Sequence, residues 1–405
     1  MNVLGVTRII VNNLSFLILY PIKFFIQKSD IIILESSSHY RYAGNPKYLY
    51  EYLSINTNYN VYWLTESEDI KQYLDSKGFK YLSNRNIIHK IYITLKARVV
   101  VGSGTSFYDL FYLVSRDKNI VKICTMHGSG PKLSLARKYH IKDSLRVIKS
   151  INSFNYVSFC TEYAGVIVGV NQMFLSHERI KLLGAPKDDM LFNSTYVDDH
   201  YNNRFMLRSI IGKNINDKCR VIYYVPTYRT YPSEFPITNL LDFDEKRFYN
   251  FLEKHDIYFI FSDHPMSEFT NLLKQNDRFI YVAEEKEPLF DNLKLMMEVD
   301  MLMGDYSTLS TDFAILKKPQ IFIMPDYEKN YKLRGYAEDI ASILPGKQVE
   351  TYEDLCKSIT TYIGNRNKFL DDFGGKVDCL LEKYMSTSKT ESSKSFTRFI
   401  SEILE

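Results

Sequence analysis

Short apolar runs alternate along the chain with longer stretches in which apolar residues recur every three or four positions. The short apolar runs in the first half cover residues 30–35, 60–65, 97–102, 120–126 and 155–160. Those in the second half cover residues 220–226, 256–262, 278–283, 299–304 and 319–325. Apolar runs of this length, bounded by turn residues, are typical of buried parallel strands.

Helical patterns separate several of these runs, for example at residues 46–55 and 67–78. Alternating strands and helices predict an α/β fold in which helices cover both faces of parallel sheets. A polar, turn-rich stretch at residues 193–218 divides the chain. We therefore expect two Rossmann-like domains, at residues 30–195 and 215–405, that face a central cleft. The stretch from residue 350 onward is helical by pattern, and the alternative is that it crosses back to the first domain.

The N-terminal segment, residues 1–29, has an apolar centre that is interrupted by Pro21 and Lys23. A membrane-spanning helix needs about 20 uninterrupted apolar residues, which this segment lacks. No small-residue cleavage site follows it, so a signal peptide is not predicted. Arg8, Lys23 and Lys28 flank or interrupt the apolar face, which favours an amphipathic segment lying on an anionic membrane surface. The alternative is a helix packed on the protein itself.

Composition narrows the class of protein. The 405 residues are 45% hydrophobic and 24% charged, which is typical of a globular chain long enough for two domains. A net charge of +3, from 51 basic and 48 acidic residues, argues against a nucleic-acid partner. Five scattered cysteines without a C-x-x-C pair, and histidines without metal spacing, indicate a reducing cytoplasm and no tightly bound metal.

Polar residues follow several of the predicted strands, and the carboxyl ends of parallel strands are where α/β proteins build ligand sites. In the first half, the segment MHGSGPKL at 126–133 supplies His127 and Lys132. A second turn, GAPKDDM at 184–190, supplies Lys187. In the second half, the segments VPTYR and SDHP supply Thr227, Arg229 and His264.

The stretch VDMLMGDYSTLSTDFA at 299–314 carries acids and hydroxyls directly after an apolar run. Asp305 is a good helix N-cap, and Ser307 and Thr308 then fall in the first turn, where free N–H groups favour an anion. Asp312 lies deeper and is expected to support the site. The alternative is an ordinary capped surface helix. Phosphate binding is favoured because similar loops follow other strands of the same half.

Taken in order, these motifs resemble those of the CDP-glycerol glycerophosphotransferases, the family that includes teichoic-acid primases and polymerases. The chain differs from the family's motifs at a few positions. In the first-half His-Gly motif these are Met126, Ser129 and one residue inserted before Pro131, and in two later motifs they are Lys187 and Tyr228. The segments that carry the resemblance are GNPKYLYEYL (44–53), MHGSGPKL (126–133), GAPKDDML (184–191), VPTYR (225–229), SDHP (262–265) and DYSTLSTDFAILKKP (305–319), with RGY (334–336) following.

The resemblance implies a GT-B-like fold and peripheral attachment to the cytoplasmic face of the membrane. It also implies a reaction in which an acceptor hydroxyl attacks the β-phosphorus of CDP-glycerol or CDP-ribitol and releases CMP. The acceptor would be a lipid-linked saccharide or a polymer, and Mg²⁺ is not expected. One alternative is a GT-B glycosyltransferase that uses a nucleotide sugar. Another is a membrane-surface binding or scaffold protein that keeps the fold without activity.

Roles for single residues follow from the same resemblance. His127 is expected to act as general base on the acceptor hydroxyl, because a near-neutral imidazole suits that task. Arg229 and His264 are expected to neutralise the diphosphate. The expected donor-binding residues are Thr227, Asp305, Ser307, Thr308 and Asp312, with Asp305 as a cap or orienting group. The expected acceptor-binding residues are Lys132, Lys187 and Asn45.

Overall fold

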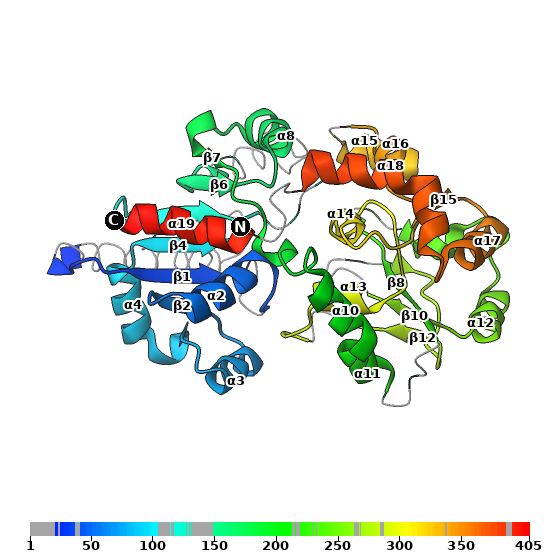
Figure 1. The fold of residues 1–405 in the computed structure, drawn as a ribbon, viewed down its shortest axis with the longest axis horizontal. Helices are drawn as coiled ribbons and strands as arrows, with labels where there is room; N and C mark the ends of the chain where they lie inside the picture. The colour runs from blue at the N-terminus through cyan, green and yellow to red at the C-terminus, as the bar shows by residue number, and fades with distance from the viewer. Residues whose placement is uncertain are drawn as a thin grey trace. The chain divides into compact units, whose positions relative to one another are not determined.

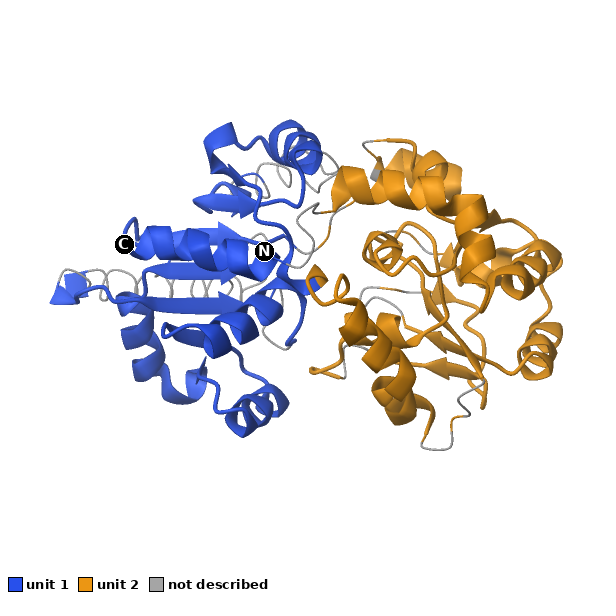
Figure 2. Cartoon of the chain, viewed as in Figure 1, with its two compact units in different colours: residues 1–127, 134–187, 391–405 blue, residues 128–133, 188–390 orange. Residues whose placement is uncertain are grey.

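The chain divides into two compact units, each built around a parallel sheet (Figures 1 and 2). Unit 1 comprises residues 1–127, 134–187 and 391–405, and unit 2 comprises residues 128–133 and 188–390. The computed structural model describes residues 21–22, 25–36, 41–103, 114, 117–126, 128, 130, 148, 150–212, 215, 219–229, 231, 233–262, 267, 269–283, 287–336, 338–385 and 391–405.

Unit 1 contains a seven-stranded sheet in the order β3-β2-β1-β4-β5-β6-β7, in which every pairing is parallel. Its strands are β1 (Ile31–Glu35), β2 (Asn60–Leu64), β3 (Tyr81–Leu82), β4 (Val99–Gly102), β5 (Val121–Cys124), β6 (Tyr156–Ser158) and β7 (Ile180–Lys181). The main helices are α2 (Gly44–Asn56), α3 (Glu68–Ser76), α4 (Ile87–Lys96) and α19 (Ser392–Leu404).

Strand register explains the core of unit 1. Alternate residues of a strand point to the same face of a sheet, so paired strands place their apolar residues side by side. Helices α2, α3 and α19 pack on one such face and share a single core with it. The strand residues in this core are Ile32, Leu34, Val61, Trp63, Val99, Val101 and Ile123, which are aligned across β2, β1, β4 and β5.

The C-terminal helix α19 belongs to unit 1, whereas the predicted boundaries placed it in the second domain. Phe396 and Ile400 are fully buried in the unit 1 core, and Arg98 donates hydrogen bonds to the last carbonyls of the helix, including that of Ile403 at 2.7 Å. Figure 1 shows this helix, at the red end of the colour range, among the blue elements of unit 1. Burial of its apolar face therefore outweighs its position in the sequence.

Unit 2 contains a six-stranded parallel sheet in the order β12-β10-β8-β13-β14-β15, and a separate two-stranded ribbon. The strands are β8 (Arg220–Val225), β10 (Ile257–Phe261), β12 (Phe279–Tyr281), β13 (Met301–Gly304), β14 (Gln320–Ile323) and β15 (Lys347–Val349), with β9 (Ser233–Glu234) and β11 (Phe269–Thr270) in the ribbon. The main helices are α12 (Glu245–Lys254), α13 (Asn292–Glu298), α14 (Leu309–Ala314), α15 (Tyr327–Arg334), α16 (Ile340–Ile343), α17 (Tyr352–Tyr362) and α18 (Arg366–Tyr384).

The predicted junction at 193–218 is partly helical and is anchored to unit 2. It contains α10 (Ser194–Asn203) and α11 (Phe205–Ile211), which pack against α13. The buried carboxylate of Glu298 accepts hydrogen bonds from the backbone N–H groups of Met206 and Leu207, at 3.1 and 2.9 Å. These N–H groups lie in the first turn of α11 and have no partner inside the helix, so the carboxylate caps it.

All ten predicted strands are present, and the α/β fold with parallel sheets is confirmed. The strands that the pattern missed are short, with two or three residues each: β3, β7, β9, β11 and β15. Residues 1–20 and 23–24, most of the predicted membrane-surface segment, lie outside the described residues. Within the described part of the chain, no helix has the length and apolar character needed to cross a bilayer.

Candidate active site

The sheet of unit 2 has a topological switch point between β8 and β13. From β8 the chain builds outward through β10 and β12, and it then returns to add β13, β14 and β15 on the other side. In open α/β sheets, ligands bind beyond the carboxyl ends of the strands at such a point. Thr227 follows β8 and Asp305 follows β13. Two predicted site residues therefore lie at this switch point.

Asp305 joins the two loops at the switch point. Its carboxylate is fully buried and accepts hydrogen bonds from the backbone N–H of Thr227 at 2.9 and 3.1 Å. It also forms an ion pair with Nη1 of Arg229 at 2.8 Å. The predicted N-cap role is wrong, because α14 begins at Leu309 with Thr308 at its N-cap position and no side-chain cap. A buried carboxylate needs charged and N–H partners, and Asp305 finds them across the switch point instead of in the helix.

Arg229 is buried and is held between two carboxylates. Its Nε and Nη2 atoms donate to Asp326 at 2.6 and 3.1 Å, and Nη1 donates to Asp305 and to the carbonyl of Thr227. Burial disfavours the charge, but the two carboxylates outweigh it and raise the pKa of the guanidinium. The guanidinium of Arg229, predicted to neutralise a diphosphate, therefore already has its charge balanced by carboxylates of the protein. It joins the loops that follow β8, β13 and β14.

Asp326 is the second partner of Arg229, and sequence reasoning did not select it. Besides the guanidinium, the hydroxyls of Tyr231 and Tyr306 donate to its carboxylate at 2.6 and 3.0 Å. Burial opposes its ionisation, yet the hydrogen bonds and charge of Arg229 hold the pKa of Asp326 below its ordinary value. The available signal was its position directly after the apolar run 319–325.

The hydroxyls predicted to bind phosphate lie at the start of α14. Ser307 and Thr308 are half-buried, and Oγ of Ser307 accepts a hydrogen bond from the N–H of Leu309 at 3.3 Å. Asp312 is buried within the same helix. The side chain of Thr227 is buried too, and its Oγ1 atom has no hydrogen-bond partner among the described residues. An unpartnered buried hydroxyl is costly, so it is a donor or acceptor available to a ligand.

Two glycines of the first-half His-Gly motif belong to unit 2 and lie against Thr308. A Cβ atom at Gly128 would lie 2.9 Å from Oγ1 of Thr308, and one at Gly130 would lie 3.0 Å from its Cγ2. A side chain at either position would therefore fit only if the side chain of Thr308 moved. The structure thereby brings these two glycines of MHGSGPKL beside Thr308 of the DYST segment.

Unit 1 has its own switch point, between β1 and β4. Glu35 ends β1, Ser36 follows it, Ser103 follows β4, and all three are buried. Buried polar side chains at this edge favour a ligand site. Their signal in the sequence is weak, because Glu35 ends an apolar run and has the pattern of a strand boundary.

Asn45 ties three segments of unit 1 together. Its Nδ2 atom donates to the carbonyls of Thr125 and Met126 at 3.1 and 3.0 Å, and its Oδ1 atom accepts from the N–H of Lys187 at 3.2 Å. Met126 has a φ of 54°, a left-handed conformation that a non-glycine residue adopts only when it is held there. Asn45, predicted to bind the acceptor, therefore has its amide occupied by backbone groups, and Lys187 is buried beside it.

Three predicted residues, His127, Lys132 and His264, lie outside the described residues. Their roles stay predictions. Among the residues that are described, no group of three or more His, Cys, Asp or Glu side chains could hold a metal ion.

Two parallel, doubly wound units with polar loops at their switch points define a GT-B-like α/β protein. Residues 18–402 match the family described as CDP-Glycerol:Poly(glycerophosphate) glycerophosphotransferase, and the chain belongs to this family. The family resemblance seen in the motifs is therefore confirmed.

Individual relatives agree with this assignment. The chain is 27% identical over 381 residues to the teichoic acid poly(glycerol phosphate) polymerase of Bacillus subtilis (strain 168), covering 89% of this chain and 48% of that protein. The chain thus spans about half the length of this relative. It is 23% identical over 410 residues to the teichoic acid glycerol-phosphate primase of the same strain, covering 98% of this chain and 99% of the primase.

A solved structure shows the same fold. The wall teichoic acid polymerase TagF aligns with a TM-score of 0.73 at 22% identity, covering 93% of this chain and 90% of the TagF chain. This likeness confirms the predicted GT-B-like α/β fold with two Rossmann-like units.

Proposed function

We propose that the protein transfers glycerol phosphate from CDP-glycerol to a hydroxyl of a polymer or lipid-linked acceptor and releases CMP. Membership of the glycerophosphotransferase family supports the reaction class. The structural observation that carries the donor site is the switch point between β8 and β13. There, the buried hydroxyl of Thr227, which has no partner among the described residues, lies beside Asp305, and the hydroxyls of Ser307 and Thr308 follow in the chain.

The chemistry is a phosphoryl transfer. The acceptor oxygen forms a bond to the β-phosphorus, the bond between the β-phosphorus and the bridging oxygen breaks, and CMP leaves with the electron pair. His127 takes the proton of the acceptor hydroxyl. Such a reaction depends on positioning and on neutralising charge at the phosphates.

We propose a different role for Arg229 from the one expected from the sequence. Because two carboxylates already compensate its charge, Arg229 positions the loop that carries Thr227 and does not itself neutralise the diphosphate. Neutralisation is assigned to His264 and to the hydroxyls of Thr227, Ser307 and Thr308. A TagF variant soaked with CDPG is known as a structure, which supports a CDP-glycerol donor for this fold.

The test of the reaction is incubation with CDP-glycerol or CDP-ribitol and an acceptor bearing glycerol phosphate, with mass analysis of the products. The expected result is CMP together with an acceptor extended by one alditol phosphate. Release of a nucleoside diphosphate from a nucleotide sugar would instead assign the chain to the glycosyltransferases. His127→Ala is expected to abolish transfer while CDP-glycerol still binds.

The test of the donor site is the affinity for CDP-glycerol in Thr227→Val and in Ser307→Ala/Thr308→Ala. Loss of one hydrogen bond to the donor should weaken binding about fivefold to tenfold for Thr227→Val, with a larger loss for the double variant. Thr360→Ala, at an exposed position of α17, is the matched control and should bind the donor normally. Unchanged donor affinity in both site variants would contradict the phosphate site.

The proposal includes an anionic membrane surface as a partner, through the basic and apolar residues of segment 1–29. Removing residues 1–28 should abolish sedimentation with anionic liposomes while leaving transfer to a soluble acceptor intact. Equal sedimentation of the shortened protein would place the attachment elsewhere.

A further inference from the structure

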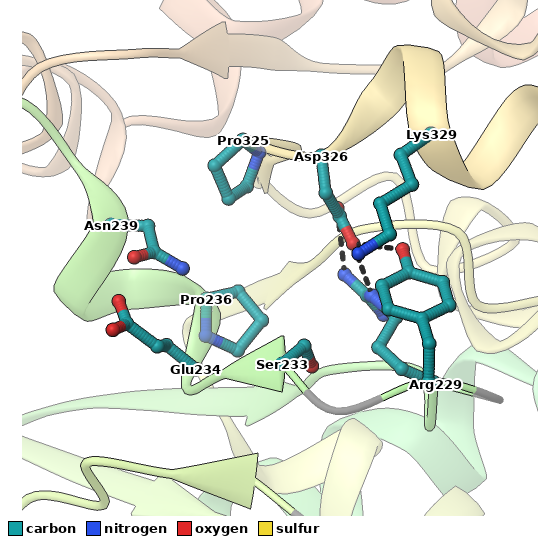
Figure 3. A pocket seen from close by; sticks show the side chains of 9 residues that line it. Arg229, Ser233, Glu234, Pro236, Asn239, Pro325, Asp326 and Lys329 are labelled. Atoms are coloured by element: carbon teal, nitrogen blue, oxygen red, sulfur yellow. Dashed lines mark hydrogen bonds and ion pairs between the residues drawn. The ribbon is translucent and has the colours of Figure 1, made fainter.

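A pocket of about 210 Å³ lies at the carboxyl edge of unit 2, next to Arg229 and Asp326 (Figure 3). It is formed by the loop after β8, by strand β9, by the turn Pro236–Asn239 and by the start of α15. Arg229 is common to this pocket and to the switch point, because the same guanidinium pairs with Asp305. The pocket therefore adjoins the proposed donor site without containing its hydroxyls.

In the wall formed by Arg229 and Asp326, the polar groups form hydrogen bonds within the protein. Asp326 accepts hydrogen bonds from Nε and Nη2 of Arg229 and from the hydroxyls of Tyr231 and Tyr306. Arg229 is in turn shared with Asp305. One guanidinium faces two carboxylates here, and the remaining negative charge is met by the N–H of Thr227 and by the two tyrosine hydroxyls, so this wall does not select a charged ligand.

The remaining polar groups of the pocket are available. The ammonium of Lys329 lies 4.0 Å from the ring centroid of Tyr231 and forms no ion pair with any described residue. Ser233 has a buried Oγ atom with no hydrogen-bond partner in the described part of the chain. Glu234 and Asn239 are exposed, and Figure 3 shows them across the pocket from Lys329.

These groups fit a particular chemistry. One lysine without a carboxylate partner in the described part of the chain matches one negative charge, and the amide of Asn239 with the carboxylate of Glu234 matches hydroxyl groups. Two prolines, Pro236 and Pro325, offer apolar faces to a short carbon chain. A diphosphate carries more charge than one lysine balances and would face Glu234, so it does not fit.

Size gives a second limit. Pockets that enclose drug-sized ligands have volumes of roughly 300–1,000 Å³. The pocket here, at about 210 Å³, is smaller and suits one short unit, not a whole nucleotide. A singly charged, hydroxyl-bearing unit of this size is a glycerol or ribitol joined through a phosphodiester.

We propose that this pocket is a subsite for one alditol phosphate unit of the acceptor chain. Lys329 binds the phosphodiester, and Asn239 and Glu234 bind the alditol hydroxyls. This inference rests on the proposed function and names its acceptor as a chain that already carries alditol phosphate. Acceptors with several such units then bind better than those with one, because only the longer chain reaches the subsite.

The first test is equilibrium binding of a poly(glycerol phosphate) oligomer to the full chain, without CDP-glycerol. Lys329→Gln should raise the dissociation constant about tenfold, the loss expected for one charged hydrogen-bonded contact. Lys332→Gln removes an exposed lysine from the same helix α15 and is the matched control, expected to bind as the unchanged protein does. Lys329→Arg keeps the charge and should restore most of the binding.

The second test separates this subsite from the donor site by steady-state kinetics. Lys329→Gln should raise KM for a several-unit acceptor, with KM for CDP-glycerol and kcat at saturating acceptor unchanged. Equal oligomer affinity in Lys329→Gln and Lys332→Gln overturns the subsite, as does a change confined to KM for CDP-glycerol. Absence of any transfer by the unchanged protein overturns the proposed reaction instead, and the binding experiment then decides the subsite alone.

Discussion

In unit 2, a buried guanidinium between two carboxylates joins the loops that follow β8, β13 and β14. In unit 1, one amide side chain joins the end of β5, the start of α2 and the Lys187 turn, and all its partners are backbone groups. Both units have doubly wound parallel sheets, so topology does not dictate how these loops are fastened. The ion pairs of Arg229 and the neutral hydrogen bonds of Asn45 differ in the free energy lost when they are broken and in their response to pH.

The difference also separates structural charge from charge offered to a ligand. The charge of Arg229 is balanced by Asp305 and Asp326, whose remaining negative charge is met by N–H and hydroxyl donors, whereas Lys329 in the neighbouring pocket has no carboxylate partner among the described residues. An arginine in a sequence motif is therefore weak evidence for phosphate binding until its partners are known. The uncompensated cation nearby is the better candidate.

The ion pairs of unit 2 and the Asn45 hydrogen bonds of unit 1 can be tested separately, because the chain has a single tryptophan, Trp63, in the core of unit 1. Its fluorescence reports the unfolding of unit 1, and circular dichroism reports both units. The variants below use these two signals in urea denaturation.

The largest effect is expected from Arg229→Met, which leaves Asp305 buried without its ionic partner. Breaking a buried pair from one side should lower the free energy of unfolding by about 3–5 kcal/mol. The transition followed by circular dichroism should move to lower urea, with the Trp63 transition unchanged. Arg278→Met, which breaks the partly exposed pair with Asp256, is the control and should cost less than about 1 kcal/mol. A similar loss in the free energy of unfolding in both variants would contradict the role of the Arg229 ion pairs in joining these loops.

A smaller effect is expected from Asn45→Ala in unit 1. Three hydrogen bonds to backbone groups are lost, and the free energy of unfolding should fall by roughly 2–3 kcal/mol. The Trp63 transition should report this loss. Asn56→Ala removes an exposed amide that bonds only within helix α2, and it should change stability by less than about 0.5 kcal/mol. An unchanged Trp63 transition in Asn45→Ala would contradict the role of this amide in joining the three segments of unit 1.

The smallest effect concerns pH. Asp326 has a pKa below its ordinary value in the folded protein, so its ionised form stabilises unit 2 above the unfolded pKa, and this stability is lost as pH falls through the folded pKa. The stability difference between the unchanged protein and Asp326→Asn should therefore shrink on acidification below about pH 4. The cost of Asn45→Ala should not change with pH, because an amide does not titrate. Urea denaturation at two pH values measures both, and equal pH responses would contradict the distinction.

Secondary structure was largely predictable because short apolar runs bounded by turn residues form buried parallel strands in a chain that alternates them with helical patterns. The runs at 30–35 and 220–226 become central strands β1 and β8, buried on both faces. Strands such as β3 and β7 escaped prediction because two residues carry no periodicity. Their pairing depends on the neighbouring strand and not on their own sequence.

Asp305 shows where local reasoning fails. A capping acid and a buried ion-pair acid have the same local signature, an Asp after a strand and before a helix. The choice depends on Arg229, which lies far away in the sequence and adjacent only once β8 and β13 pair. The same applies to Asn45, whose partners come from Thr125, Met126 and Lys187.

The sequence by itself determined the parallel α/β fold, the family and the positions of the polar loops, because these depend on periodic patterns and ordered motifs. Only the tertiary structure decided which polar groups satisfy one another and which are left for a ligand. Arg229 and Lys329 are equally basic in the sequence, yet burial between two carboxylates occupies the first, and exposure beside a tyrosine ring leaves the second available. Hydrogen-bond and charge compensation are properties of neighbours in space, which no local stretch of sequence contains.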